Sequence, residues 1–423
     1  MKDADIGRML EEIRQLTEMS ATPPKEGITR VSWTGEYVEG TDFIKRRMQE
    51  AGLEVWEDRM GNVCGCLRGE NPKGSILSGS HLDTVHCSGA FDGVMGVICA
   101  LETARLLQEN GIRLQNHYKV LAMAEEEGTR TEHVLAGSTY IRSCLETTAG
   151  VSGAELPDLE TKDGKKLWEV IRGYKEAEKI KVPERPILQR EKMVYVEVHD
   201  EQGPVLERNE MEIGIVDQIR GILNFEICLR GISGHPGTVP MSERRDCSLA
   251  AYEICLLASR YVREYFDQEA TITFGEMEIR PGSSNCIPGE AVFTVDIRFR
   301  HQETGEMIEQ KVMELVRGQQ EKLGLYATCS MHMCKEPTPL DDFLKKLIGG
   351  VCIRQKRKGM RIDSGAGHDA MNFAKICPAA MIFSPCKGGV SHNVQEFVSE
   401  KDIQNVTNVL YETILELDKE IGK

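Results

Sequence analysis

The chain has 423 residues, with 52 Lys or Arg against 67 Asp or Glu, so its formal net charge is −15. Hydrophobic residues make up 40% and charged residues 28%, which is typical of folded globular domains and not of disordered chains. The acidic balance argues against a nucleic-acid partner, whose phosphates require a Lys/Arg surface. No apolar run has the roughly 18 residues that a membrane span needs.

Two features of the sequence indicate the compartment. The opening residues contain no apolar signal core. The fourteen cysteines are scattered, and no Cys-x-x-Cys pair occurs among them. This usage is typical of reduced thiols rather than of a secreted disulfide framework. We therefore expect a cytoplasmic protein.

The first part of the chain alternates between helical and extended patterns. Apolar residues recurring at intervals of three and four predict helices at 4–18, about 40–52 and 92–109. Short apolar runs predict strands at 53–58, 63–67, 75–78 and 118–124. This alternation favours an α/β layer whose ligand chemistry lies at the strand ends.

The pattern changes after Ile215 and changes back near residue 338. The middle part is predicted to hold strands at 219–230, 270–279, 290–300 and 325–333 and helices at 243–265 and 304–323. The α/β pattern then resumes with a strand at 379–383 and a closing helix at 400–420. We therefore expect a discontinuous α/β domain of residues 1–215 and 329–423, interrupted by an inserted α+β unit of residues 216–328.

The first cluster of polar residues follows the strand at 75–78. His81 comes at the strand end, Asp83 two residues later, and Asp92 at the start of a helix. A metal-binding histidine needs an acceptor for its other ring nitrogen, and Asp83 is placed for that role. Asp92 could offer one oxygen to each of two metals. Taken singly, Asp92 could instead cap the helix, and His81 could be a polar strand end.

The second cluster consists of three adjacent carboxylates, Glu125, Glu126 and Glu127, directly after the strand at 118–124. Neighbouring carboxylates repel one another unless a cation or a proton relieves them. Two of them could divide the work, one binding metal while the other, with a raised pKa, moves protons. The alternative is an acidic loop that faces solvent.

Further histidines lie in compact polar stretches. His199 ends a predicted strand, His392 follows the strand at 379–383, and His235 lies in the inserted unit. Each alone could be a hydrogen-bonded structural residue, but His81, Asp92, Glu127, His199 and His392 together form a mixed His/carboxylate set near strand ends. Such a set suits two borderline cations, zinc or manganese, bridged by one carboxylate. His368, in a Gly-rich turn, is predicted to form a pocket wall. Phosphate-loop, nucleophilic-serine and His-Glu-x-x-His motifs are absent from the sequence.

The ordered motifs resemble the amidase/hydantoinase/carbamoylase family of two-metal hydrolases. The resemblance covers almost the whole chain and rests on Gly79–Gly93, Ala122–Arg130, Glu197–Glu207, His235–Asp246, Asn285–Arg298, Ser364–Ala370 and Ser391–Asn393. It implies an exopeptidase-like catalytic domain with an inserted, ferredoxin-like lid and dimerisation domain. It also implies two divalent ions, zinc or manganese, with cobalt or nickel as further options.

The resemblance also implies roles for individual residues. One metal would be bound by His81, Asp92 and His199, and the other by Asp92, Glu127 and His392. Glu126 matches the general base, and His235 matches a lid residue that stabilises the oxyanion. Asn285 and Arg298 match lid residues that hold the carboxylate of a small substrate. A homodimer through the lid is expected, with the predicted helix at 243–265 contributing.

The substrate implied is an N-carbamoyl-L-amino acid or allantoate, whose linear amide or ureido C–N bond is hydrolysed with release of ammonia. Ile222 departs from the family pattern, which has a Gln there that reads the polar substrate, and Gln218 could substitute for it. Ile222 therefore keeps an N-acyl amino acid amidase or a dipeptidase of the same fold as an alternative. A metal-free binding protein on the same scaffold is the alternative from another class.

Overall fold

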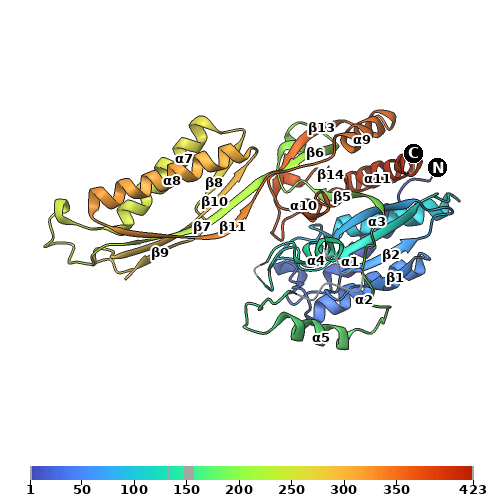
Figure 1. Cartoon of the computed structure of the whole chain (residues 1–423), viewed down its shortest axis with the longest axis horizontal. Coiled ribbons are helices and arrows are strands. Elements are labelled where there is room, and N and C mark those ends of the chain that lie inside the picture. The colour runs from blue at the N-terminus through green and yellow to red at the C-terminus, as the bar shows by residue number, and fades with distance from the viewer. Residues whose placement is uncertain (1, 132, 147–156, 422–423) are drawn as a thin grey trace. The chain divides into compact units, whose positions relative to one another are not determined.

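The computed structural model describes residues 2–131, 133–146 and 157–421 (Figure 1). Its strands are β1 Glu54–Glu57, β2 Val63–Leu67, β3 Gly74–His81, β4 His117–Met123, β5 Lys192–Asp200, β6 Ile213–Ile219, β7 Gly221–Arg230, β8 Ala270–Thr273, β9 Met277–Arg280, β10 Glu290–Phe299, β11 Tyr326–Lys335, β12 Thr338–Pro339, β13 Gly359–Ser364 and β14 Ala379–Ser384. Its α-helices are α1 Ile6–Thr17, α2 Gly35–Glu50, α3 Val94–Glu109, α4 Ala136–Glu146, α5 Leu167–Ala177, α6 Val205–Arg208, α7 Cys247–Tyr265, α8 Gln302–Leu323, α9 Asp342–Arg354, α10 Ala370–Phe373 and α11 Glu400–Glu420.

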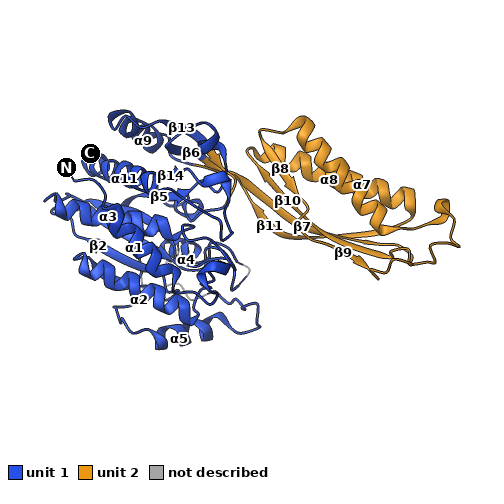
Figure 2. Ribbon diagram, turned by 180° about the vertical axis from the view of Figure 1, so that it is seen from behind, with its two compact units in different colours: residues 1–217, 340–362, 367–423 blue, residues 218–339, 363–366 orange. Residues whose placement is uncertain are grey.

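The described part of the chain divides into two compact units (Figure 2). The first comprises residues 1–217, 340–362 and 367–423, and the second comprises 218–339 and 363–366. The sequence places the end of the second unit at 328, whereas the structure places it at 339. The reason is that β11 continues to pair with β7 as far as Lys335, which lies opposite Ile222.

The first unit is built on a mixed sheet whose strand order begins β1-β2-β4-β3-β5-β14-β6. The central strands β4, β3, β5 and β14 run parallel to one another, so their carboxyl ends meet at one edge of the sheet. Every residue of β3 and β14 is buried, as expected for parallel strands covered on both faces. Helix α3 packs on β3, β4 and β5, and α1 and α11 pack against α3.

Helix α3 is buried from Val94 to Leu107, which explains its apolar character on all sides. It begins at Val94, two residues later than the sequence predicts, because Gly93 adopts a φ of 66° and ends the preceding turn. A Cβ atom on Gly93 would lie 2.4 Å from Cε1 of His81. Glycine is therefore needed here to bring the start of α3 against the His81 ring.

The second unit is an antiparallel sheet with the order β11-β7-β10-β8, with β9 also paired to β10. The chain order β7-α7-β8-β10-α8-β11 is that of a ferredoxin-like fold. Alternate residues of β7 and β10 are buried together with the inner faces of α7 and α8. The strand predicted at 270–279 is two strands, because 274–276 place three residues opposite two of β10 and so interrupt the pairing.

None of the helices in the described ranges combines the length and the apolar character that a membrane span requires. The fourteen cysteines all lie in these ranges, and no disulfide bond links any of them.

Candidate metal centre

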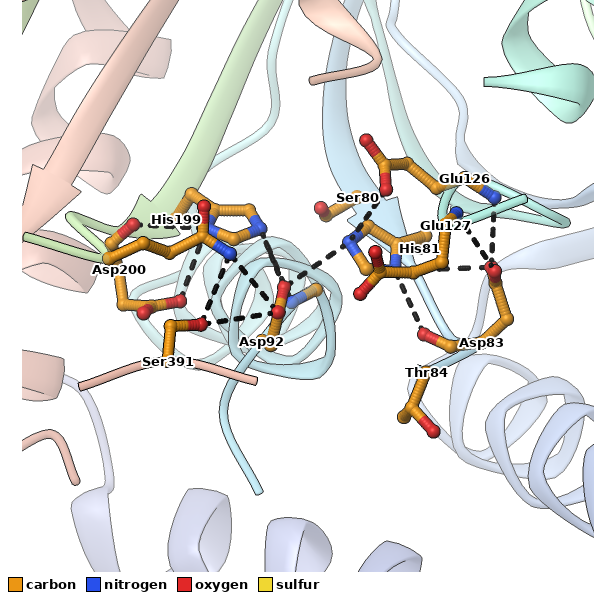
Figure 3. A network of polar contacts seen from close by, with 12 residues as sticks. Ser80, His81, Asp83, Thr84, Asp92, Glu126, Glu127, His199, Asp200 and Ser391 are labelled. Carbon is orange, nitrogen blue, oxygen red and sulfur yellow. Dashed lines mark hydrogen bonds and ion pairs between the residues drawn. The ribbon is translucent and has the colours of Figure 1, made fainter. Parts of the chain in front are cut away.

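Four neighbouring strands of the first unit deliver polar side chains to one edge of the sheet (Figure 3). His81 is the last residue of β3, and His199 is the next-to-last residue of β5. Glu126 and Glu127 follow β4. The remaining members of the group are Asp92, just before α3, and His392, which follows β14. The structure thus brings the five predicted ligands and Glu126 together, although they come from positions spread over more than 300 residues.

Asp92 lies at the middle of this group and faces both sides with its two oxygens. Its Oδ1 lies 3.5 Å from Nε2 of His81 and 3.3 Å from Nε2 of His199. Its Oδ2 lies 3.1 Å from Nε2 of His392, which in turn lies 3.5 Å from Oε1 of Glu127. Asp92 therefore belongs to two groups of ligand atoms, one on each side of its carboxylate.

The donor chemistry of these two groups fits divalent cations. Ligand atoms at about 2.1 Å from a tetrahedral zinc lie about 3.4 Å from one another, and the separations around Asp92 are close to that value. Oε1 of Glu127 is buried and has no hydrogen-bond partner among the described residues. Burial and the nearby Asp92 raise the pKa of Glu127 to about 7, and burial raises the pKa of Glu126 well above its usual range. Cations would relieve this crowding of carboxylates.

The alternative roles considered for these residues, namely a helix cap, an ordinary polar strand end and a solvent-facing loop, do not agree with the structure. Gly93 holds the N-cap position of α3, and the side chain of Asp92 contacts the histidines instead. Glu125 and Glu126 are buried, with 0% and 7% of their surfaces exposed, so the carboxylates after β4 are not a solvent-facing loop. His81 is likewise 2% exposed.

Asp83 supports the site differently from the expectation. The His81 ring nitrogen Nδ1 contacts the main-chain oxygen of Asp83 at 3.0 Å, while the carboxylate oxygen Oδ1 lies 3.9 Å away. The carboxylate instead accepts the main-chain N–H groups of Glu126 and Glu127, both at 3.1 Å. The Asp83 carboxylate therefore fixes the segment that carries the two glutamates, and its carbonyl group orients the imidazole.

Glu396 and Gln202, for which the sequence predicts no role, hold Asp92 in place. Glu396 accepts the main-chain N–H groups of Phe91 and Asp92 at 2.8 and 3.0 Å. Gln202 Nε2 donates to Oδ2 of Asp92 at 3.1 Å and to the Ser391 hydroxyl at 3.2 Å. Gln202 lies three residues after His199, and that spacing is the one signal in the sequence that could have pointed to it.

His368 is buried next to the candidate ligand His199. It is 2% exposed, and the centroid of its ring lies 4.6 Å from that of His199 and 5.6 Å from that of Phe383. The predicted pocket wall is therefore a side chain that packs directly against a candidate ligand.

The other predicted site residues lie in the second unit. His235 and Asn285 are exposed, and Arg298 is half-buried on β10. Arg298 makes a two-point ion pair with Asp296, with Nε–Oδ1 and Nη2–Oδ2 distances of 2.7 and 3.0 Å. The Gln218 amide donates to the Arg300 carbonyl group at 3.1 Å, so its nitrogen is engaged in the unit's own structure. The contacts of these four predicted residues with substrate stay predictions.

Ile222 is 4% exposed and lies on β7 opposite both Arg298 of β10 and Lys335 of β11. Its aliphatic side chain is therefore buried at the position on β7 that pairs with Arg298, the residue predicted to bind the substrate carboxylate.

Comparisons with known proteins agree with this geometry. The model of peptidase family M20/M25/M40 matches residues 77–416. An N-carbamoyl-L-amino-acid amidohydrolase of Paenarthrobacter aurescens is 31% identical over 99% of this chain and 100% of its own, and an allantoate amidohydrolase of Escherichia coli is 33% identical over 93% and 94%. The crystal structure of an amidase of the hydantoinase/carbamoylase family from Burkholderia multivorans superposes with a TM-score of 0.87 at 30% identity, covering 98% of each chain.

The chain therefore belongs to peptidase family M20/M25/M40, among its hydantoinase/carbamoylase amidases. Members of this family depend on metal, and the groups around Asp92 are the candidate ligands in this chain.

Removal of metal is expected to lower the melting temperature of the first unit. Binding to the folded state at 100 times Kd adds about 2.7 kcal/mol, which corresponds to a shift of about 4 °C in a unit of about 300 residues. Calorimetry with and without a chelator, followed by addition of Mn²⁺ or Zn²⁺, measures the effect. An unchanged transition after verified metal removal would contradict the assignment of a metal centre here.

Proposed function

We propose that the protein is a two-metal amidohydrolase that hydrolyses a ureido C–N bond in an N-carbamoyl-L-amino acid or in allantoate and releases ammonia. The observation that carries this proposal is the position of Asp92 between two His/carboxylate groups, with Glu126 beside them. The activities named for the relatives support the same bond type.

The two ions would be held on either side of Asp92. His81, Asp92 and His199 would bind one, and Asp92, Glu127 and His392 the other. Zinc or manganese suits these donors, and cobalt or nickel would also bind them. Such a pair of ions, when bound, polarises the scissile carbonyl group and lowers the pKa of the attacking water towards about 7.

Glu126 is the residue proposed to move the proton. Its Oε2 lies 3.8 Å from Nε2 of His81, at the edge of the ligand group, and its main chain is fixed by Asp83. The raised pKa of the buried Glu126 carboxyl suits a group that accepts a proton from water and returns it to the leaving nitrogen.

The second unit is proposed to act as a lid that supplies the substrate contacts. His235 would donate a hydrogen bond to the developing oxyanion. Asn285 and Arg298 would hold the substrate carboxylate, for which the guanidinium offers paired donors. Asp296 engages Nε and Nη2 of Arg298, and Nη1 makes only a long contact of 3.5 Å with the Gly365 carbonyl oxygen, which the substrate carboxylate would replace.

The second unit is also proposed to join two copies of the chain. Leu249, Tyr252 and Leu256 of α7 recur along one helix face and are 49%, 53% and 52% exposed. Exposed apolar side chains in a row are typical of a protein interface. We also propose a cytoplasmic location, which the lack of disulfide bonds among the cysteines of the described residues supports.

Ammonia release tests the proposed activity. Metal-free protein is reloaded with Mn²⁺ or Zn²⁺ and supplied with allantoate, N-carbamoyl-L-amino acids, N-acetyl-L-amino acids and dipeptides. We expect ammonia from the ureido substrates only. N-acyl substrates and dipeptides yield free amino acid and no ammonia when they are cleaved. Cleavage of these substrates alone, detected as free amino acid, would replace the ureido proposal with an amidase or a dipeptidase. Absence of both turnover and bound metal would indicate a binding protein.

A further inference from the structure

A buried aspartate, Asp200, lies next to the candidate ligand His199 (Figure 3). The Nδ1 nitrogen of His199 contacts the main-chain oxygen of Asp200 at 3.0 Å, and Oδ1 of the Asp200 carboxylate lies 3.1 Å from the same nitrogen. Both oxygens favour a hydrogen on Nδ1, which leaves the lone pair on Nε2. That nitrogen lies 3.3 Å from Oδ1 of Asp92, on the side where metal would bind.

The other ligand of the same group, His81, has a weaker support. Its Nδ1 also contacts an aspartate main-chain oxygen, that of Asp83, at 3.0 Å. The Asp83 carboxylate is farther away, at 3.9 Å, and is engaged by two main-chain N–H groups. A carboxylate within contact distance of Nδ1 is therefore a property of His199 and not of His81.

The Asp200 carboxylate has no structural role that explains its burial. It is 0% exposed, and apart from the contact with Nδ1 of His199 its oxygens have no hydrogen-bond or ion-pair partner among the described residues. Burial of a charge is unfavourable unless a partner compensates it, and His199 is the partner in contact with this carboxylate. The next residue, Glu201, shows the contrast, because its carboxylate accepts the N–H groups of Val205 and Leu206 and so caps α6.

We propose that Asp200 is a positioning residue that fixes the His199 ring for metal binding and strengthens the His81–Asp92–His199 position. The inference rests on the proposed two-metal function. A charged partner on the outer nitrogen makes an imidazole a better metal donor, and the loss of such a partner typically lowers metal affinity by about 10- to 100-fold. The Asp92–Glu127–His392 position lacks this support and should be affected less.

Metal titration of three proteins tests the proposal. Metal-free wild type, Asp200→Asn and Glu201→Gln are titrated with Zn²⁺ or Mn²⁺ against a competing chelator. We expect two bound ions in the wild type and, in Asp200→Asn, a drop of about 10- to 100-fold in one of the two affinities. Glu201→Gln, the matched control, should retain both affinities. The metal-free melting temperature of Asp200→Asn should stay close to that of the wild type, because asparagine keeps the size of the side chain and its amide oxygen can still accept from Nδ1 of His199.

Each other outcome overturns a specific statement. Wild-type affinities at both positions of Asp200→Asn would remove the role of Asp200 and leave the two-metal function intact. A metal-free Asp200→Asn protein that is less stable than the wild type, or unfolded, would make the carboxylate a support of the fold and overturn the positioning role. A wild type that binds no ions would overturn the proposed metal centre itself.

Discussion

Replacement of Glu126 by glutamine is expected to reduce kcat by about 10²- to 10⁴-fold, the range that general acid–base catalysis contributes, while both metal ions remain bound. Glutamine keeps the size of the side chain and leaves unchanged the hydrogen bond from the main-chain N–H of residue 126 to the Asp83 carboxylate. Its amide cannot accept a proton from water or return one to the leaving nitrogen. Ammonia release measures the rate, and elemental analysis measures the metal content.

The neighbouring glutamate offers a matched control for this variant. The Glu125 carboxylate is buried like that of Glu126, but its Oε1 accepts the main-chain N–H groups of Arg130 and Thr131. Glu125→Gln should therefore retain most of the turnover. Loss of an ion from Glu126→Gln would instead identify Glu126 as a ligand, a role that its grouping with His81 and Glu127 also permits. Turnover within tenfold of the wild type would exclude Glu126 as the base.

Replacement of Asp92 by asparagine is expected to remove both ions and reduce turnover below detection. Each of its oxygens faces a different ligand group, so the substitution weakens both positions at once. The loss of affinity should exceed the roughly 10- to 100-fold that follows from losing an outer contact. Metal content per chain after dialysis is the measurement.

Single-sided variants provide the comparison for Asp92→Asn. His392→Gln removes a ligand from the group with Glu127 only, so one ion should remain. An Asp92→Asn protein that keeps one ion with unchanged affinity would show that Asp92 is not shared between two metals.

The sequence predicts the position of the centre because strand ends can be recognised from local patterns. The apolar runs before His81 and before Glu125–Glu127 mark β3 and β4, and parallel neighbours bring their carboxyl ends together. The same reasoning places His199 at the end of β5 and His392 after β14. The catalytic roles of these residues were predicted from family resemblance and stay to be tested.

Other features have no local pattern that could predict them. Glu396 contacts the main chain of Phe91 and Asp92, 305 and 304 positions away, and in the sequence it resembles any acidic residue in a loop. Asp200 gives no signal of burial, because a carboxylate inside a protein is rare. The residues from 274 to 276 interrupt an otherwise continuous strand pattern, since one extra residue shifts the pairing with β10.

The separation of His392 from the other ligands has a consequence for biosynthesis. Four of the five predicted ligands lie at or before residue 199, and the second unit intervenes before His392 is made. During translation a nascent chain that ends in the second unit contains His81, Asp92 and His199 but not His392 or Glu396. The two sets of ligands would therefore become complete one after the other, and the second only after the whole second unit has been synthesised.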